Sequence, residues 1–272
     1  MTANVLISYL FIDGACLNAT LRKIGERYLG GVTPSLDWTR MRKPHRKVFY
    51  YDAIPVQKSD EDDNTHSSRV APKRSELARI ARQDGYHVRT GEAYRRRGRG
   101  NEQKMVDVQL AVDALLMASR GLFGSCTLIT GDLDFKPLVS ALVEMGVNVE
   151  LLYPKDETNE DLKAAADRAE AVTIDIVRDW SGDAQRGLLP FGGLDLQSTF
   201  VEPHTKLFVW RDENYGDCYI TNGSGLFELR TERAPEGPET HRLYVRASTA
   251  KGLRAYAEEK FDLIVPPIAS AV

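Results

Sequence analysis

Aspartates stand at two points where an apolar run of the chain ends. Asp13 follows the run 5–12, and Asp132 and Asp134 follow the run 126–129. Runs of this kind predict buried strands, and the ligands of parallel α/β sheets bind at the edge where the strands end. Because hard divalent cations prefer carboxylate oxygens as ligands, this placement predicts a cation site at that edge.

A third acidic contribution comes from Asp107, which lies in the predicted helix 103–120. Ala111 and Ala114 follow on the same side of this helix, and their small side chains would let it approach the sheet closely and direct Asp107 to the sheet edge. Asp113 lies about 240° further round the helix. We therefore expect Asp113 to form an ion pair elsewhere and to stay outside the site.

These carboxylates suit phosphodiester hydrolysis, which needs an activated water and relief of the charge that builds on the phosphate. Mg²⁺ or Mn²⁺ held by oxygen ligands supplies both, and Mg²⁺ uses few protein carboxylates because it keeps several waters. We expect Asp13, Asp107 and Asp132 to hold the metal, with Asp134 as a supporting catalytic residue. Asp13 and Asp134 each have an alternative role as the N-cap of the following helix, whereas Asp132 has none.

Other kinds of catalytic site fit the sequence less well. A haloacid dehalogenase phosphatase needs a second Asp two residues after its nucleophile, where Ala15 stands, and a Toprim site needs Glu in place of Asp13. A serine hydrolase would carry a G-x-S-x-G motif, which this sequence lacks, and Cys16 has no obvious His partner along the chain.

The composition limits the fold and the partners. The chain has 272 residues, enough for one large domain or two small ones, and a net charge of −3, which gives no overall basic character for nucleic acid. Its three cysteines form no C-x-x-C pair, which argues against zinc or disulfides and favours a reducing, cytoplasmic location. We expect no signal peptide and no membrane span, since no apolar run approaches roughly 18 residues.

Strands and helices alternate along the first 180 residues. We expect strands over residues 5–12, 47–52, 86–90, 126–130, 147–153 and 172–176. We expect helices over residues 17–28, 72–84, 103–120, 135–145 and 159–169, and a polar loop over residues 56–68. This alternation predicts an α/β fold in which a mostly parallel sheet is sandwiched by helices.

The pattern changes near Trp180, so we expect a second, smaller α+β domain. We place the first domain over residues 1–180, a linker over 181–204 and the second domain over 205–272. Strands are expected over 206–210, 218–222, 226–231 and 241–246, with turns at 213–216 and 222–223 and a helix over 248–261. We expect these strands to form a core and an edge for a homo-oligomer, with an RNA-binding surface as the alternative.

Two basic clusters are candidates for binding a polyanion. The stronger one directly precedes the helix of Asp107, and its members are Arg95, Arg96, Arg97, Arg99 and Lys104. Guanidinium groups pair well with phosphate oxygens, and Lys104 is placed to contact a phosphate or to pair with Asp107. The weaker cluster, within residues 40–47, is expected at the opposite sheet edge. Nothing here reads a base sequence, so we expect single-stranded or structured RNA, bound by backbone and shape.

Four sequence blocks, taken together, resemble the NYN domain family, a branch of the PIN-like nucleases, and look closest to its LabA-like group. The blocks are FIDG at 11–14, VFYYD at 48–52, KMVDV with LAVD within 104–113, and TGDLDFKPLV at 130–139. The resemblance covers roughly residues 8–176. It implies a PIN-like parallel sheet and Mg²⁺- or Mn²⁺-dependent RNA cleavage, with Asp13, Asp107 and Asp132 as the metal site and Asp134 in support.

One position departs from that family pattern. The pattern usually reads D-G-x-N, and Cys16 stands here at the Asn position. Asn18 is close in sequence but faces about 200° away from Cys16 on a helix. The alternatives left open are a weaker or Mn²⁺-preferring nuclease, a catalytically weak or inactive RNA-binding or regulatory module, and a nuclease acting on DNA or flap structures.

Overall fold

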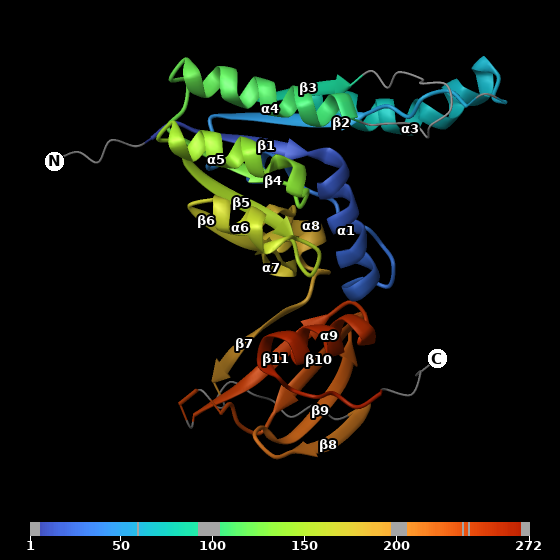
Figure 1. Ribbon diagram of the computed structural model, residues 1–272. Helices are drawn as coiled ribbons and strands as arrows, with labels where there is room; N and C mark the ends of the chain where they lie inside the picture. The colour runs from blue at the N-terminus through green and yellow to red at the C-terminus, as the bar shows by residue number, and fades with distance from the viewer. Residues whose placement is uncertain are drawn as a thin grey trace. The chain divides into compact units, whose positions relative to one another are not determined.

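Two sheets of different kinds organise the chain (Figure 1). The structure is a computed structural model that describes residues 6–58, 60–91, 104–196, 206–235, 237–238 and 240–267. The chain divides into two units, one of Met1–Thr20 with Asp37–Thr173 and the other of Leu21–Leu36 with Ile174–Val272. Each unit contains one of the sheets.

The first unit is built on a six-stranded parallel sheet. Its strands are β1 (Ser8–Asp13), β2 (Lys47–Ala53), β3 (Tyr86–Gly91), β4 (Ser125–Ile129), β5 (Asn148–Pro154) and β6 (Arg168–Val172). Their order is β3-β2-β1-β4-β5-β6, so the chain moves outward in one direction from β1 and in the other from β4. The carboxyl ends of β1 and β4 therefore flank the point where the order reverses, which is where ligands of such sheets bind.

Helices cover both faces of this sheet. They are α1 (Gly14–Tyr28), α2 (Trp38–Arg42), α3 (Asp63–Ala81), α4 (Lys104–Ser119), α5 (Lys136–Glu144) and α6 (Glu160–Ala165), with the short 3₁₀ helix η1 (Leu133–Phe135) before α5. α4, α5 and α6 lie on one face (Figure 1), where Phe11 and Tyr51 pack in a common core with Leu110 and Ala114. Ala114 is fully buried, which confirms the expected close approach of α4.

The opposite face carries the alternate side chains of the same strands, as the period of two in a strand requires. Tyr50 lies between Phe49 and Tyr51 in sequence and meets the edge of Trp38 with ring centroids 5.9 Å apart. Trp38 also packs edge-on against Tyr86 at 5.7 Å. Both faces of the sheet are thus buried, as the predicted helix-sandwiched fold requires.

The second unit contains a five-stranded antiparallel sheet in the order β7-β11-β10-β9-β8. Its strands are β7 (Phe191–Leu196), β8 (Phe208–Asp212), β9 (Gly216–Gly223), β10 (Leu226–Thr231) and β11 (His241–Ala247). The helix α9 (Ala250–Phe261) packs on β10 and β11 and buries Leu253, Tyr256 and Ala257. The helices α7 (Ile174–Trp180) and α8 (Asp183–Arg186) precede this sheet.

The second half of α1 belongs to the second unit, and hydrogen bonds to α9 explain why. The Thr249 hydroxyl, which caps α9, donates to the carbonyl of Tyr28 at 2.9 Å. The Tyr28 hydroxyl donates to Glu259 at 2.5 Å, and Arg27 pairs with Glu259 at 2.8 Å. The predicted domain boundary at residue 180 stays a prediction. It divides the chain into successive segments, whereas the contacts between α1 and α9 join segments that are far apart in the sequence.

The predicted loop over 56–68 is wrong in its second half, where α3 already begins at Asp63. Asp62 caps this helix, since its side chain accepts from the backbone N–H groups of Asn64 and Thr65 at 2.9 and 3.0 Å. A capping aspartate before a polar first turn is a start signal that outweighs the lack of an apolar pattern. Pro72, expected to open the helix, lies inside it.

The predicted helix over 159–169 and strand over 172–176 are also placed differently. α6 ends at Ala165, residues Arg168–Val172 form β6, and α7 begins at Ile174. β6 pairs in parallel with β5 at the edge of the sheet. Pairing with that edge overrides the helical preference of an Ala- and Glu-rich segment.

In the second unit, the turn between β9 and β10 is displaced from the predicted 222–223. Asn222 and Gly223 pair with β10, and the turn residues are Ser224 and Gly225, both with positive φ. The segment 181–204, predicted as a linker, contains α8 and β7 in its described part. Among the described residues, no helix has the length and apolar character needed to cross a membrane.

Candidate active site

Asp13 ends β1 at the point where the strand order reverses. Its Oδ1 accepts from the backbone N–H of Cys16 at 3.1 Å, and its Oδ2 accepts from the Thr130 hydroxyl at 3.2 Å. Burial is the main cause that raises the pKa of Asp13, and the charge of Asp52 raises it further. Asp13 therefore combines the two predicted roles, since it caps the start of α1 and presents a carboxylate at the sheet edge.

Asp132 and Asp134 lie across the same point, after β4. Asp132 caps η1, because its Oδ1 accepts from the backbone N–H of Asp134 at 3.0 Å. Its own N–H donates to the Thr130 hydroxyl at 3.3 Å, so Thr130 links Asp132 to Asp13. The expected capping roles are reversed, since Phe135 holds the N-cap position of α5 without a side-chain bond and Asp134 stays exposed.

Asp107 lies in the first turn of α4 and is half-buried. Burial, followed by the charges of Asp13, Asp132 and Asp134, raises the pKa of Asp107 to about 6. Nearby like charges disfavour the ionised form of a carboxyl group, which is why they raise its pKa. Hydrogen bonds through Thr130 join the segments of Asp13, Asp132 and Asp134, and Asp107 lies near enough for the charges of these three residues to raise its pKa.

A buried ion pair beside this cluster was missed by sequence reasoning. Asp52 is the next-to-last residue of β2, is 5% exposed, and pairs through Oδ2 with the Lys73 ammonium of α3 at 2.6 Å. A Cβ atom on Gly14 would lie 2.6 Å from the same Oδ2, so only glycine lets α1 start this close to β2. The place of Asp52 near the end of a predicted strand could have marked it as a residue near the site. Lys73 could not be recognised as its partner, because the helix was predicted to begin at residue 72, whereas α3 begins at Asp63.

The Cys16 thiol lies next to the acidic cluster. Burial and then the charge of Asp13 raise the pKa of Cys16 to about 12, although the backbone of Gly131 partly lowers it. The thiol is therefore neutral at physiological pH. Asn18 points elsewhere, as expected, since its Nδ2 donates to the Tyr50 hydroxyl at 3.2 Å and to Asp52 at 3.5 Å.

Asp113 lies outside the cluster and forms the expected ion pair. Its Oδ2 accepts from the Tyr51 hydroxyl at 3.1 Å and lies 3.6 Å from Nε of Arg89. The predicted RNA-binding residues Arg95, Arg96, Arg97 and Arg99 lie outside the described residues, and of Lys104 only the backbone, at the start of α4, is described. Lys47 opens β2 and so places the weaker basic cluster at the amino edge, opposite the aspartates, as predicted.

With the geometry established, a family model of the NYN domain was found to match residues 8–174. The chain belongs to the NYN domain family. The matched segment spans all six strands of the parallel sheet and all four aspartates of the cluster. The antiparallel sheet of the second unit lies beyond it, and residues 21–36 of the NYN segment group with that second unit.

Comparison with solved structures gave a protein of unknown function from Vibrio parahaemolyticus. It is 18% identical, covers 64% of this chain and 97% of its own chain, and aligns with a TM-score of 0.46. No curated protein matches the sequence.

The donor chemistry of the NYN cluster suits a hard divalent cation, because all four side chains offer carboxylate oxygens. In the described part of the chain, however, no three His, Cys, Asp or Glu side chains are close enough to one another to hold an ion. A bound ion would therefore need water ligands or rotated aspartate side chains. The charge and the donor type of the four aspartates fit a hard divalent cation.

Proposed function

We propose that this protein is a metal-dependent endoribonuclease that hydrolyses RNA phosphodiester bonds at the aspartate cluster. The observation that carries the proposal is the place of the aspartates, since Asp13 ends β1, Asp132 follows β4, and the Thr130 hydroxyl bonds to both where the strand order reverses. Burial, followed by the charges of Asp13, Asp132 and Asp134, also raises the pKa of Asp107 to about 6. Such a concentration of like charge weakens a fold unless a cation or a proton offsets it. Its place at the reversal of the strand order is where a ligand of this fold is expected.

Asp13, Asp107 and Asp132 would hold Mg²⁺ or Mn²⁺, which when bound supplies an activated water and offsets charge on the phosphate. The chain's own contribution is to orient these carboxylates. Thr130 donates to Asp13 and accepts from the N–H of Asp132, so one buried hydroxyl sets the position of both segments. The N–H of Asp134 orients the Asp132 carboxylate, and Asp134 itself adds negative charge facing Asp107.

RNA would be bound by the basic segment that leads into α4, namely Lys104 with Arg95, Arg96, Arg97 and Arg99. α4 begins at Lys104, one turn before Asp107. The basic segment therefore precedes the end of α4 that carries Asp107. Guanidinium and ammonium groups there would hold phosphate oxygens on either side of the scissile bond. These contacts carry no base specificity, which favours single-stranded or structured RNA recognised by its backbone.

A second candidate function is an RNA-binding or regulatory module with weak or no catalysis. The neutral Cys16 thiol beside Asp13 favours it, because a thiol is a poorer hydrogen-bond partner for metal-bound water than the amide that the family pattern places there. In that case the basic segment would still bind RNA, but no water at the carboxylates would be placed to attack the phosphate.

The deciding experiment is cleavage of end-labelled single-stranded RNA and of DNA of the same sequence, in Mg²⁺, in Mn²⁺ and in EDTA. The Asp132→Asn variant should lose cleavage. The matched control is Asp217→Asn, since Asp217 is 64% exposed and pairs with Arg211 in the second unit. Metal-dependent RNA cleavage lost only in Asp132→Asn would support the nuclease, whereas RNA binding without cleavage in either metal would support the binding module.

A further inference from the structure

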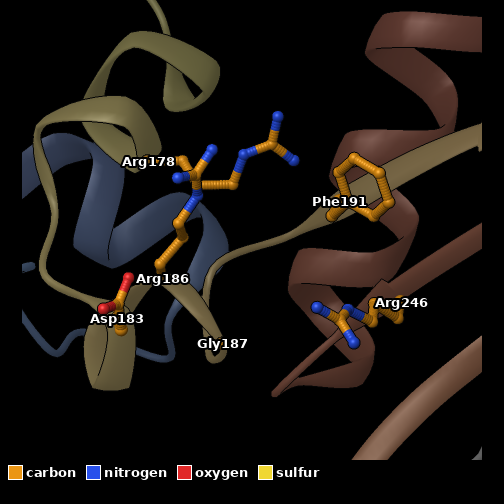
Figure 2. A pocket seen from close by; sticks show the side chains of 6 residues that line it. All are labelled: Arg178, Asp183, Arg186, Gly187, Phe191 and Arg246. Atoms are coloured by element: carbon orange, nitrogen blue, oxygen red, sulfur yellow. The ribbon is translucent and has the colours of Figure 1, made fainter.

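A separate pocket lies in the second unit, beyond the segment that matches the NYN domain. Its volume is about 340 Å³, and it is lined by Arg178, Asp183, Arg186, Gly187, Phe191 and Arg246. These residues come from α7, α8, the start of β7 and β11 (Figure 2). Three arginines and one aspartate line the pocket, so the pocket is basic in a chain whose net charge is negative, although Arg186 also pairs with Asp179 at 3.1 Å.

Two of these arginines have buried donors that nothing in the described residues satisfies. Nε and Nη1 of Arg178 and Nε of Arg246 are buried and have no hydrogen-bond partner there. The Asp175 carboxylate lies 3.7 Å from Nη2 of Arg178, and Asp175 also pairs with Lys260 and accepts from the Tyr256 hydroxyl. Because buried donors without partners are costly and rare in folded proteins, these groups point to a ligand with acceptor oxygens.

The pocket also offers an aromatic surface. The guanidinium carbon of Arg178 lies 4.6 Å from the centroid of the Phe191 ring, and that of Arg246 lies 5.9 Å from it. Figure 2 shows the Arg178 side chain extending from α7 toward this ring and the Arg246 side chain beside it. Phe191 is nevertheless 40% exposed. A planar group could therefore stack on the ring or on the guanidinium planes next to it.

We propose that this pocket binds a nucleoside phosphate, with the phosphate on Arg178 and Arg246 and the base against Phe191. Guanidinium donors match phosphate oxygens in geometry and charge. The volume exceeds what a phosphate alone requires and falls at the lower end of the roughly 300–1,000 Å³ of ligand pockets. The nucleoside phosphate comes either from a free mononucleotide or from one residue of an RNA strand, and the proposal stands whether or not the NYN cluster cleaves RNA.

The test is to measure ligand binding to the full chain by thermal shift and by calorimetry. Both measurements are made in EDTA, so that no metal is bound at the aspartate cluster. The probes are AMP, adenosine, inorganic phosphate and a short single-stranded oligoribonucleotide. AMP should raise the melting temperature more than phosphate, and adenosine should have little effect. An oligonucleotide that binds more tightly than AMP and is displaced by it would identify RNA as the source, and an oligonucleotide that does not bind would identify the free nucleotide.

The variants Arg178→Gln and Arg246→Gln should each weaken AMP binding about tenfold or more, as the loss of a charge-assisted contact implies. Arg211→Gln is the matched control, because Arg211 lies in the same unit, is 72% exposed and pairs with Asp217. Arg246→Gln also guards against a folding defect in Arg178→Gln, since Arg178 packs within α7 and Arg246 lies on a different element. Equal binding of AMP and adenosine, no binding of AMP or RNA, or unchanged affinity in folded Arg246→Gln would overturn the proposal.

Discussion

At the scale of single residues, the site is defined by negative charge that the described part of the fold concentrates around Asp107. Asp52 has Lys73 as a counter-ion at 2.6 Å, whereas burial and three carboxylates raise the pKa of Asp107, and no cation among the described residues lowers it. The two acidic groups therefore have different roles. Asp52 is a structural group that supports the start of α1, and Asp107 is poised for a ligand that brings positive charge.

Replacing Asp107 by Asn should abolish cleavage and yet stabilise the metal-free protein at neutral pH. The pKa of Asp107 is about 6 when folded and 3.8 in its ordinary state. The folded protein therefore binds a proton at Asp107 more tightly than the unfolded chain does. This contribution to stability is full below pH 3.8 and is lost as the pH rises through about 6. We expect Asp107→Asn to raise stability by on the order of 1 kcal/mol at pH 7.5, after allowance for solvent screening of a half-exposed group.

The measurement is chemical denaturation in EDTA at pH 4.5 and 7.5. The free energy of unfolding of Asp107→Asn should exceed that of the natural protein by more at pH 7.5 than at pH 4.5. Added Mg²⁺ should make this difference smaller, because it should stabilise only the natural protein. Asp113→Asn is the control on the same helix, and it should lose stability because it breaks the pair with Arg89. A gain in the free energy of unfolding that does not depend on pH would show that the carboxylates of Asp13, Asp132 and Asp134 do not destabilise ionised Asp107.

Replacing Cys16 by Asn should increase metal-dependent cleavage. The thiol lies beside Asp13 and Gly131 and remains neutral, so an amide at this position would add a stronger donor and acceptor to the cluster. One added hydrogen bond of ordinary strength corresponds to roughly a fivefold gain in rate. Single-turnover cleavage in Mg²⁺ and Mn²⁺ measures it, with Cys126→Ala as a control for cysteine loss. An unchanged rate would mean that Cys16 does not limit catalysis.

At the scale of elements, the places of the aspartates in the fold could be predicted from the sequence, because these residues lie where elements begin or end. Asp13 and Asp132 follow apolar runs, and the ends of parallel strands must meet at one edge. The same reasoning fails where tertiary pairing decides the structure. β6 forms in a helix-prone segment because the edge of β5 is available, and α3 begins early because Asp62 caps it. The pair of Asp52 and Lys73 joins two elements whose packing no local pattern predicts.

Replacing Lys73 by Met should destabilise the first unit strongly. Asp52 is almost fully buried, so it would keep a charge without a counter-ion, and such changes cost roughly 3 kcal/mol or more. The double variant Lys73→Met with Asp52→Asn should recover much of this loss. Lys136→Met is the matched control, because Lys136 and Asp161 form an exposed pair that is worth about 1 kcal/mol at most. Urea denaturation measures all of these, and equal losses for Lys73→Met and Lys136→Met would contradict the argument.

At the scale of the whole molecule, the two units are not successive segments of the chain. The NYN match ends at residue 174, but residues 21–36 lie within it and group with the C-terminal unit. The sequence could not show this, because the contacts of α1 with α9 join residues more than 200 positions apart. A boundary chosen from the family match alone would therefore leave half of α1 without its partners.

A chain cut after residue 180 should consequently be less stable than its NYN fold suggests. The cut removes α9 and with it three contacts of α1, from Thr249 to Tyr28, from Tyr28 to Glu259 and from Arg27 to Glu259. Leu29 and Tyr28, at 6% and 3% exposure, belong to the unit that the cut dismantles. We expect the melting temperature to fall by at least about 5 °C, the shift that a loss of a few kcal/mol produces in a domain of this size.

The point variant Glu259→Gln in the full chain isolates the polar part of this effect. It keeps α9 in place and weakens only the bonds from Tyr28 and Arg27, so its melting temperature should fall by less than that of the shortened chain. Calorimetry of both proteins makes the comparison. If the shortened chain melts at the temperature of the full chain, α1 does not depend on the C-terminal unit, and the aspartate cluster at the start of α1 can be studied in the NYN segment alone.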